Sequence, residues 1–191
     1  MSQNFLFKSS FHVLLIEIDR EMADICAKKG CAYCGAKLHQ ADYPRSPMGM
    51  PPSFRDQYNQ RISFCCANCR KRTTPPSIRF FGRRWYPAPI CIFISIMTSG
   101  INKRRISLIK KHFGIVVYES TWRRWRKWWR DEFVVTKFWQ QAKGQLPPKN
   151  EITQGPFPRV IFNFYLGNIE KKMLLFLPFL SPLTGGIFRA V

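Results

Sequence analysis

Two pairs of cysteines with the same spacing are the clearest chemical signal in this sequence. CAYC places Cys31 and Cys34 two residues apart, and CANC does the same for Cys66 and Cys69. Each pair can form a tight knuckle turn that points two thiolates at one ion, and two knuckles complete the tetrahedral four-thiolate shell that zinc prefers. The polar insert between the pairs is long, but lengthening a loop costs little entropy. We therefore predict a structural Zn²⁺ held by these four cysteines, with no open coordination position for catalysis.

Other cysteines and a histidine are weaker candidates for this site. Cys65 precedes Cys66, but only Cys66 completes the second C-x-x-C pair, and His39 is an alternative ligand. A pair of redox dithiols is the competing interpretation, although it does not explain two pairs at one spacing. Cys26 and Cys91 lie in apolar, helical stretches, so we expect them in the core.

A second concentration of functional side chains lies in ESTWRRWRKWWRDEF, residues 119–133. Helical periodicity, at about 100° per residue, separates its aromatic residues from its basic residues. The aromatic arc consists of Tyr118, Trp122, Trp125, Trp129 and Phe133. The basic residues that point away from it are Arg123, Arg124, Lys127 and Arg130. We predict a helix with one face for a core and one for an anionic partner. Trp128 belongs to neither set, and we expect it to pack on the C-terminal region, with stacking on a base as the alternative.

The chain as a whole is strongly basic. Its 191 residues include 31 Lys and Arg against 11 Asp and Glu, which gives a net charge of +20. This charge favours nucleic acid as the partner, with an anionic membrane surface as the competing class. The basic residues are spread along the chain instead of flanking a long apolar segment, so we expect no membrane association. Without a recognisable secretory signal, the seven cysteines predict a reducing, cytoplasmic compartment, with nucleoid association in a bacterium.

The chain is predicted to divide into four parts. In residues 1–30 we expect an N-terminal helix over about 10–28, which ends at Gly30. Residues 31–76 predict the zinc ribbon, with Pro75 and Pro76 as a linker or turn after it. Residues 77–140 predict a helix-turn-helix domain, and residues 141–191 a linker and an apolar helical segment broken at Pro178 and Pro182. The apolar side of the first helix is expected to consist of Val13, Leu14, Ile18, Met22 and Ile25.

Three helices are expected after the ribbon, over about 88–99, 103–113 and 120–133. Gly114 permits a tight turn between the second and third, and Ser120 is placed to cap the third. The predicted fold is therefore mainly α, with a small β zinc ribbon and a trihelical helix-turn-helix unit. His12 and His112 have no evident partners in the sequence and receive no role.

The third helix of such a unit enters the DNA major groove. Thr121, Arg123 and Arg124, with Lys127, lie near its start and are expected to reach base edges or nearby phosphates. In RFFGRRWY, Arg79, Arg83 and Arg84 are predicted to cross the phosphate backbone between the two modules, where they would position the protein without specifying sequence. Arg130 in the third helix and Arg104 and Arg105 in the second are further predicted DNA contacts.

The ribbon motifs CAYC and CANCRKR, followed by RRISLIKKHFGIVVYESTWRRW, carry a family resemblance. They resemble the N-terminal DNA-binding part of bacterial insertion-sequence transposases and their small zinc-ribbon regulators, over roughly residues 31–133. The resemblance implies that the zinc ribbon and the helix-turn-helix both bind double-stranded DNA, that the four cysteines hold zinc, and that the helix from Ser120 reads the DNA. It also implies recognition or regulation for a mobile genetic element, with other mobile-element or phage proteins as possible partners.

Full transposases differ in one respect that matters for activity. Their strand transfer needs three separated carboxylates in a large domain that holds two divalent cations. Beyond Glu132 this chain carries only Glu151 and Glu170, so we expect no enzymatic activity, and a truncated or decayed enzyme is one interpretation. Two alternative functions remain at this point: a zinc-dependent RNA or single-stranded nucleic-acid binding module, and a protein-interaction adaptor of a transposition or phage complex.

Overall fold

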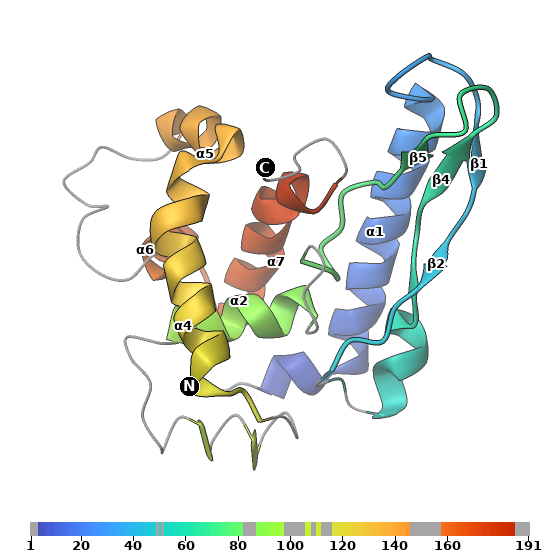
Figure 1. Cartoon of the computed structure of the whole chain (residues 1–191). Helices are drawn as coiled ribbons and strands as arrows, with labels where there is room; N and C mark the ends of the chain where they lie inside the picture. The colour runs from blue at the N-terminus through green and yellow to red at the C-terminus, as the bar shows by residue number, and fades with distance from the viewer. Residues whose placement is uncertain are drawn as a thin grey trace. The chain divides into compact units, whose positions relative to one another are not determined.

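A computed structural model describes residues 4–48, 50, 52–81, 87–97, 106–107, 110–111, 116–145 and 158–185. The described residues form two compact units, and the chain passes from one to the other after Ala88 and returns after Leu177. The first unit therefore combines the N-terminal part of the chain with the segment that begins at Pro178. Helices predominate, and a three-stranded antiparallel sheet and a two-stranded one accompany them, which confirms the coarse fold prediction (Figure 1).

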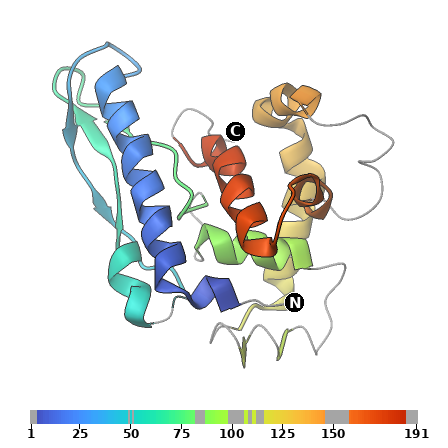
Figure 2. The same ribbon diagram turned by 180° about the vertical axis from the view of Figure 1, so that it is seen from behind.

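The first unit pairs one long helix with the sheet. Helix α1 spans Ser9–Lys29, and both views show the sheet running alongside it (Figures 1 and 2). Three antiparallel strands follow the order β1-β4-β5, while β2 pairs with β3. The strands are β1 Leu38–Gln40, β2 Tyr43–Pro44, β3 Gln60–Arg61, β4 Phe64–Cys66 and β5 Arg72–Thr73. Short 3-10 helices span Asn4–Phe7 and Pro52–Tyr58.

Helix α1 ends where the sequence predicts but buries a different face. Its C-cap is Gly30, whose φ of 75° favours glycine; an added Cβ would lie 2.7 Å from the Gly35 carbonyl oxygen. The predicted apolar side is wrong, because Val13, Leu14 and Ile25 are 41%, 38% and 54% exposed. The helix carries apolar residues on two sides, and the buried side is the one that includes a charge. Its buried residues are Phe11, His12, Leu15, Asp19 and Ala23.

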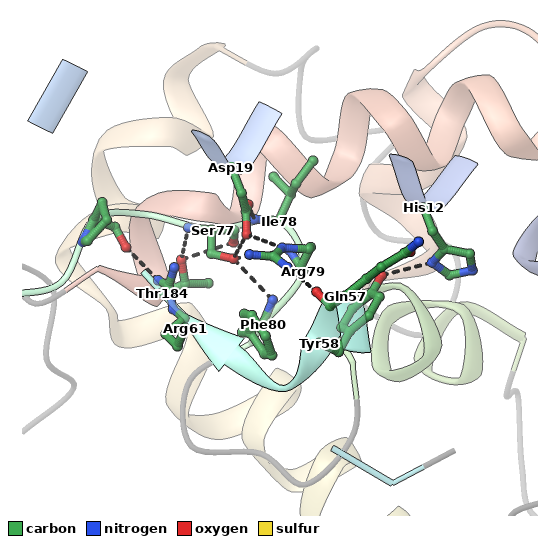
Figure 3. Close-up of polar contacts among 11 residues, drawn as sticks. His12, Asp19, Gln57, Tyr58, Arg61, Ser77, Ile78, Arg79, Phe80 and Thr184 are labelled. Carbon is green, nitrogen blue, oxygen red and sulfur yellow. Dashed lines mark hydrogen bonds and ion pairs between the residues drawn. The ribbon is translucent and has the colours of Figure 1, made fainter. Parts of the chain in front are cut away.

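A buried polar cluster explains the inward position of Asp19 (Figure 3). One carboxylate oxygen accepts the Ile78 backbone N–H at 2.7 Å. The other accepts the Ser77 hydroxyl at 2.6 Å and Arg79 Nε at 2.8 Å, with both charged side chains at most 5% exposed. Arg79 also donates to the Gln57 backbone carbonyl. The predicted phosphate contact by Arg79 is therefore wrong, since its guanidinium is buried and joins α1 to the segment after β5.

That segment is part of the core and not an exposed linker. Pro75 is buried, and its carbonyl oxygen accepts a hydrogen bond from the buried Arg61 at 2.5 Å. The Ser77 backbone N–H donates to the Thr184 hydroxyl at 2.7 Å, which joins the C-terminal segment to the first unit (Figure 3). The prediction of a linker at Pro75 and Pro76 was based on the prolines alone. It is wrong because tertiary hydrogen bonds hold this segment in the core.

His12, which received no role from the sequence, has two buried partners. Its Nε2 donates to the Leu6 carbonyl oxygen at 2.8 Å, so that Nδ1 is left to accept from the Tyr58 hydroxyl at 2.9 Å (Figure 3). The ring also packs against Phe54, with 4.4 Å between the ring centroids. This arrangement fits a neutral imidazole, because a proton on Nδ1 would face the hydroxyl hydrogen of Tyr58.

We expect His12 to make the protein less stable in mild acid. Burial lowers the pKa of His12 below the usual 6.5, against the opposing effect of its bond to Leu6. The unfolded chain therefore takes up this proton first, and stability falls as the pH drops below about 6.5, by on the order of 1 kcal/mol. Denaturant titrations from about pH 8 to about pH 5 should show the loss. This acid-induced loss of stability should be smaller in His12→Gln but unchanged in His39→Gln, which replaces an exposed histidine. Equal losses of stability in the two variants would contradict the prediction.

The second unit is built from helices. The first expected helix is confirmed as α2, whereas most of the second, 103–113, lies outside the described residues, so the trihelical arrangement stays a prediction. Pro178 does not break the last helix, because it lies inside α7 between the buried residues Leu177 and Leu180. No helix in the described ranges has both the length and the apolar character needed to cross a membrane. The helices are α2 Ala88–Met97, α4 Glu119–Lys127, α5 Lys137–Ala142, α6 Arg159–Phe164 and α7 Ile169–Leu180; the first residue of α2 and the last three of α7 belong to the first unit.

Candidate metal centre and basic helix

The four predicted cysteine ligands converge in the first unit. The sulfur atoms of Cys31, Cys34, Cys66 and Cys69 all lie within 4.8 Å of one another. Across the two knuckles, Cys31 Sγ lies 3.6 Å from Cys69 Sγ and Cys34 Sγ lies 3.4 Å from Cys66 Sγ. Two sulfurs bound to one tetrahedral zinc are separated by about 3.8 Å, given zinc–sulfur bonds of about 2.3 Å. The four thiols therefore form a site suited to one metal ion.

Backbone hydrogen bonds shape both knuckles. In the first, which follows α1, the Gly35 N–H donates to the Cys31 carbonyl at 2.8 Å. In the second, which joins β4 to β5, the N–H groups of Asn68 and Cys69 both donate to Cys66 Sγ at 3.4 Å. Burial raises the pKa of the Cys66 thiol, but these N–H groups, together with the neighbouring thiols of Cys34 and Cys69, bring that pKa down to about 6. The neighbouring thiols in turn raise the pKa of Cys69, so Cys66 is the ligand whose metal-binding thiolate form is favoured near neutral pH.

The metal centre is built on the end of α1 and on the sheet. Cys31 and Cys66 belong to a buried cluster with Ala23 of α1, Leu38 of β1 and Phe64 of β4. Strand pairing places Leu38 opposite Cys66 and so brings the second knuckle to the start of β1. The ligands are thus part of the small core of this unit, and metal binding and packing are coupled.

The choice of Cys66 over Cys65 is confirmed by the geometry. Cys65 Sγ lies 3.5 Å from the Arg70 carbonyl oxygen and is not among the four clustered sulfurs. His39 is exposed on β1, directly opposite Cys65, and is outside the cluster as well. Cys91 is buried as predicted, while Cys26 is half-buried and packs against the cluster around the knuckles.

The two knuckles end in the same backbone conformation but in different residues. Gly35 and Arg70, each directly after the second cysteine of its pair, have φ values of 71° and 58°. A side chain in this left-handed region costs about 1 kcal/mol, whereas glycine adopts it readily. Among the described residues, Arg70 is the one non-glycine with positive φ. The second knuckle thus carries an exposed arginine where glycine would be the less strained choice.

Helix α4 divides into the two predicted faces. Trp122, Trp125, Trp129 and Phe133 are at most 6% exposed, which confirms the aromatic arc. The prediction that Tyr118 belongs to this arc is wrong, because Tyr118 is the N-cap residue in an extended conformation and is 71% exposed. Ser120 likewise lies inside the first turn and provides no cap. A π-helical turn, Trp128–Glu132, continues α4, and a 3-10 turn follows at Phe133–Val135.

The predicted cationic side chains of α4 are exposed, but three of them have local partners. Arg123 Nη2 donates to Glu119 Oε1 at 2.7 Å, and Arg124 Nη2 donates to the Thr121 hydroxyl at 3.2 Å. Arg130 donates through Nε and Nη2 to the two carboxylate oxygens of Asp131 at 2.6 and 3.0 Å. Solvent-exposed ion pairs contribute little, so a phosphate can replace these carboxylates. The exposed basic residues are Arg123, Arg124, Arg126, Lys127 and Arg130.

Arg126 and Trp128 lie on the same segment but outside the predicted cationic set. Arg126 was not among the predicted contacts; its wheel position is about 40° from Trp122, yet its side chain is exposed. Trp128 is half-buried and packs edge-on against its neighbour Trp129, with 4.8 Å between ring centroids, which agrees with the prediction that it packs against protein, although the predicted partner was the C-terminal region. The remaining predicted contact residues, Arg83, Arg84, Arg104 and Arg105, lie outside the described residues.

Comparisons with known proteins add no relatives to this picture. A scan against protein-family models finds no match, and searches of curated proteins and of solved structures find none either. Function is therefore inferred from the four-cysteine centre and α4 themselves.

Proposed function

We propose that this protein binds double-stranded DNA through the basic face of α4, with a structural Zn²⁺ on the four cysteines. The observation that carries the proposal is the separation of faces on α4. Its tryptophans are buried in the second unit, so the helix is anchored, while five cations on the same short segment point into solvent. An anchored helix with an exposed cationic face is what major-groove recognition requires.

The proposed mechanism separates affinity from sequence preference. Exposed cations that neutralise phosphates release counterions and supply most of the affinity. Arg123 and Arg124, near the start of α4, would supply sequence preference, since a guanidinium can donate two parallel hydrogen bonds to guanine. Recognition or regulation for a mobile genetic element, without catalysis, is the role that the family resemblance supports.

The structure favours duplex over single-stranded nucleic acid at α4. Single strands are bound by exposed aromatic rings on which unpaired bases stack. Trp122, Trp125 and Trp129 are buried, and Trp128 is engaged by its neighbours Trp129 and Phe133. Helix α4 therefore presents basic side chains that can contact phosphates, whereas its tryptophans are not available for stacking on unpaired bases.

Selection of bound sequences from a random duplex pool tests the proposal. Zinc-loaded full-length protein should enrich a motif, and Arg123→Ala with Arg124→Ala should abolish it, because each bidentate arginine–base pair contributes about 1–3 kcal/mol of discrimination. Arg126→Ala with Arg20→Ala removes the same charge from the flank of α4 and from α1, and should retain the motif.

Three results would contradict this assignment. A motif that survives the Arg123 and Arg124 substitutions would exclude α4 as the reading element. Stronger binding to a single-stranded pool would favour the RNA-type alternative, in which unpaired bases are recognised. Absence of binding to either pool would favour a protein-interaction adaptor.

A further inference from the structure

Helix α1 has an exposed face that combines acidic and apolar side chains. We propose that this outer face of α1 docks a basic amphipathic helix of a partner protein. Its carboxylates repel DNA and anionic membranes, so the inference goes beyond the proposed function and does not depend on it. The outer face is defined by the exposed residues Leu14, Glu17, Glu21, Asp24 and Ile25 and by the half-buried Ile18.

Acidic residues are concentrated on this helix although the chain as a whole is basic. Residues 13–25 contain four of the 11 Asp and Glu of the chain, but one of its 31 Lys and Arg. Asp19 is buried in the polar cluster, whereas Glu17, Glu21 and Asp24 are exposed. Of the ion pairs in the described ranges, none involves these three carboxylates. They are therefore available to cations of a partner.

The exposed carboxylates do not stabilise α1 itself. Glu17 and Glu21 are four residues apart, and Glu21 and Asp24 are three apart, which are the spacings at which like charges destabilise a helix. None of the three lies in the first turn, where negative charge would interact favourably with the helix dipole. Helix stability therefore gives no reason for this charge pattern, whereas recognition of a basic partner does.

An apolar row runs beside the carboxylates. Around the helix, Leu14, Ile18 and Ile25 fall within an arc of about 40°, and the three carboxylates fall within an adjacent arc of about 60°. Leu14 is 38% exposed and Ile25 is 54% exposed. These two side chains are separated by about 16 Å along the helix axis, which is about three turns. A partner helix of that length, with an apolar row beside a row of Lys or Arg, is complementary to this face.

A second copy of this chain fits the outer face less well. An isologous contact joins the same patch of both copies, so the carboxylates of one α1 would meet those of the other. Such a contact between like charges is unfavourable. Helix α4 of another copy is basic, but Trp122, Trp125 and Trp129 are buried, so α4 has no exposed apolar row to match Leu14 and Ile25. The complementary helix is therefore assigned to a different protein.

Peptide binding to full-length, zinc-loaded protein tests the inference. The probe is a fluorescein-labelled synthetic peptide of about 18 residues, with Leu on one face of an amphipathic helix and Lys on the other. Fluorescence anisotropy should detect binding, and Glu17→Lys with Glu21→Lys should weaken it by about tenfold, because attraction becomes repulsion. Asp56→Lys with Glu132→Lys is the control, since it makes the same change of charge at exposed carboxylates elsewhere.

The apolar row is tested by a second variant. Leu14→Ser with Ile25→Ser should also weaken peptide binding by about tenfold, because an apolar contact of both side chains is lost. Its control is Val135→Ser with Leu166→Ser, which replaces side chains that are 72% and 82% exposed. Thermal midpoints close to wild type are expected in both test variants, since the four replaced side chains are exposed, and they separate loss of binding from loss of folding.

Several results would overturn the inference. Wild-type protein that does not bind the peptide, or binding that is equal in the charge variant and its control, would exclude the outer face of α1 as a docking site. Equal affinity for a peptide with Ser in place of every Leu would show attraction by charge without helix docking. Dimers that are lost in Leu14→Ser with Ile25→Ser, measured by sedimentation, would assign the face to a second copy. The Glu17 and Glu21 substitutions should leave the selected duplex motif unchanged, so this inference and the proposed function fail separately.

Discussion

Chelation of the metal from zinc-loaded protein should abolish the cooperative thermal transition of the first unit. Cys31 and Cys66 are at once ligands and members of the small core between α1 and the sheet, so loss of the ion removes the bonds that close both knuckles. Structural zinc contributes about 10–16 kcal/mol in isolated zinc modules, which matches or exceeds the whole stability of a typical domain. Circular dichroism melts with and without chelator, with metal content measured by mass spectrometry, would record the change.

Adjacent cysteines provide a matched pair of variants for this prediction. Cys66→Ser should lower metal content and reproduce the effect of chelation. Cys65→Ser alters the neighbouring thiol, which is outside the four-sulfur cluster, and should leave both metal content and the melt close to wild type. A chelator-treated protein with an unchanged transition, or equal effects of the two substitutions, would contradict a structural metal on these cysteines.

Asp19→Ala should be the most damaging single substitution in α1. The carboxylate accepts three hydrogen bonds from the segment after β5, and its loss leaves the buried guanidinium of Arg79 without its ion-pair partner. Removal of one partner from a buried ion pair costs about 3–5 kcal/mol, because the other charge stays buried. Denaturant midpoints of metal-loaded protein should show this loss.

Glu17→Gln is the control for Asp19→Ala, since it removes an exposed carboxylate from the same helix. Surface substitutions of this kind usually change stability by less than about 0.5 kcal/mol. Adding Arg79→Leu to Asp19→Ala removes the unpaired charge, and should recover part of the stability lost in the single variant. Similar midpoints for Asp19→Ala and Glu17→Gln would show that the cluster does not hold α1 in place.

The features that the sequence predicts well are those set by local spacing. The spacing of each C-x-x-C pair places its two thiolates on one knuckle turn, independently of the tertiary fold. All four candidate ligands come together as predicted. Likewise, the three- and four-residue steps between Trp122, Trp125, Trp129 and Phe133 specify one helical face. The position of Gly30 after a long amphipathic run also predicts the end of α1 correctly.

The features that the sequence misses depend on contacts between distant residues. Helix α1 has apolar residues on two sides. Prediction from sequence assumes that charged residues face solvent, and it therefore assigns the side without Asp19 to the core. The hydrogen bonds from Ser77, Ile78 and Arg79, which are 58–60 residues from Asp19, make the other side favourable. A stripe at four-residue steps, Phe11, Leu15, Asp19 and Ala23, is the signal that would have identified the inner face. Pro75 gives no such signal, because its burial depends on Arg61 and on the returning C-terminal segment.

The hydrogen bond between Ser77 and Thr184 also affects how the chain reaches its native state during synthesis. Its two partners are 107 residues apart, and the whole second unit lies between them. At translation rates of about 5–20 residues per second, Thr184 is made roughly 5–20 s after Ser77. During that interval α1 and the sheet are complete but lack the last segment that packs on them. A metal ion captured early by the two knuckles would hold the nascent ribbon closed while the ribosome finishes the chain.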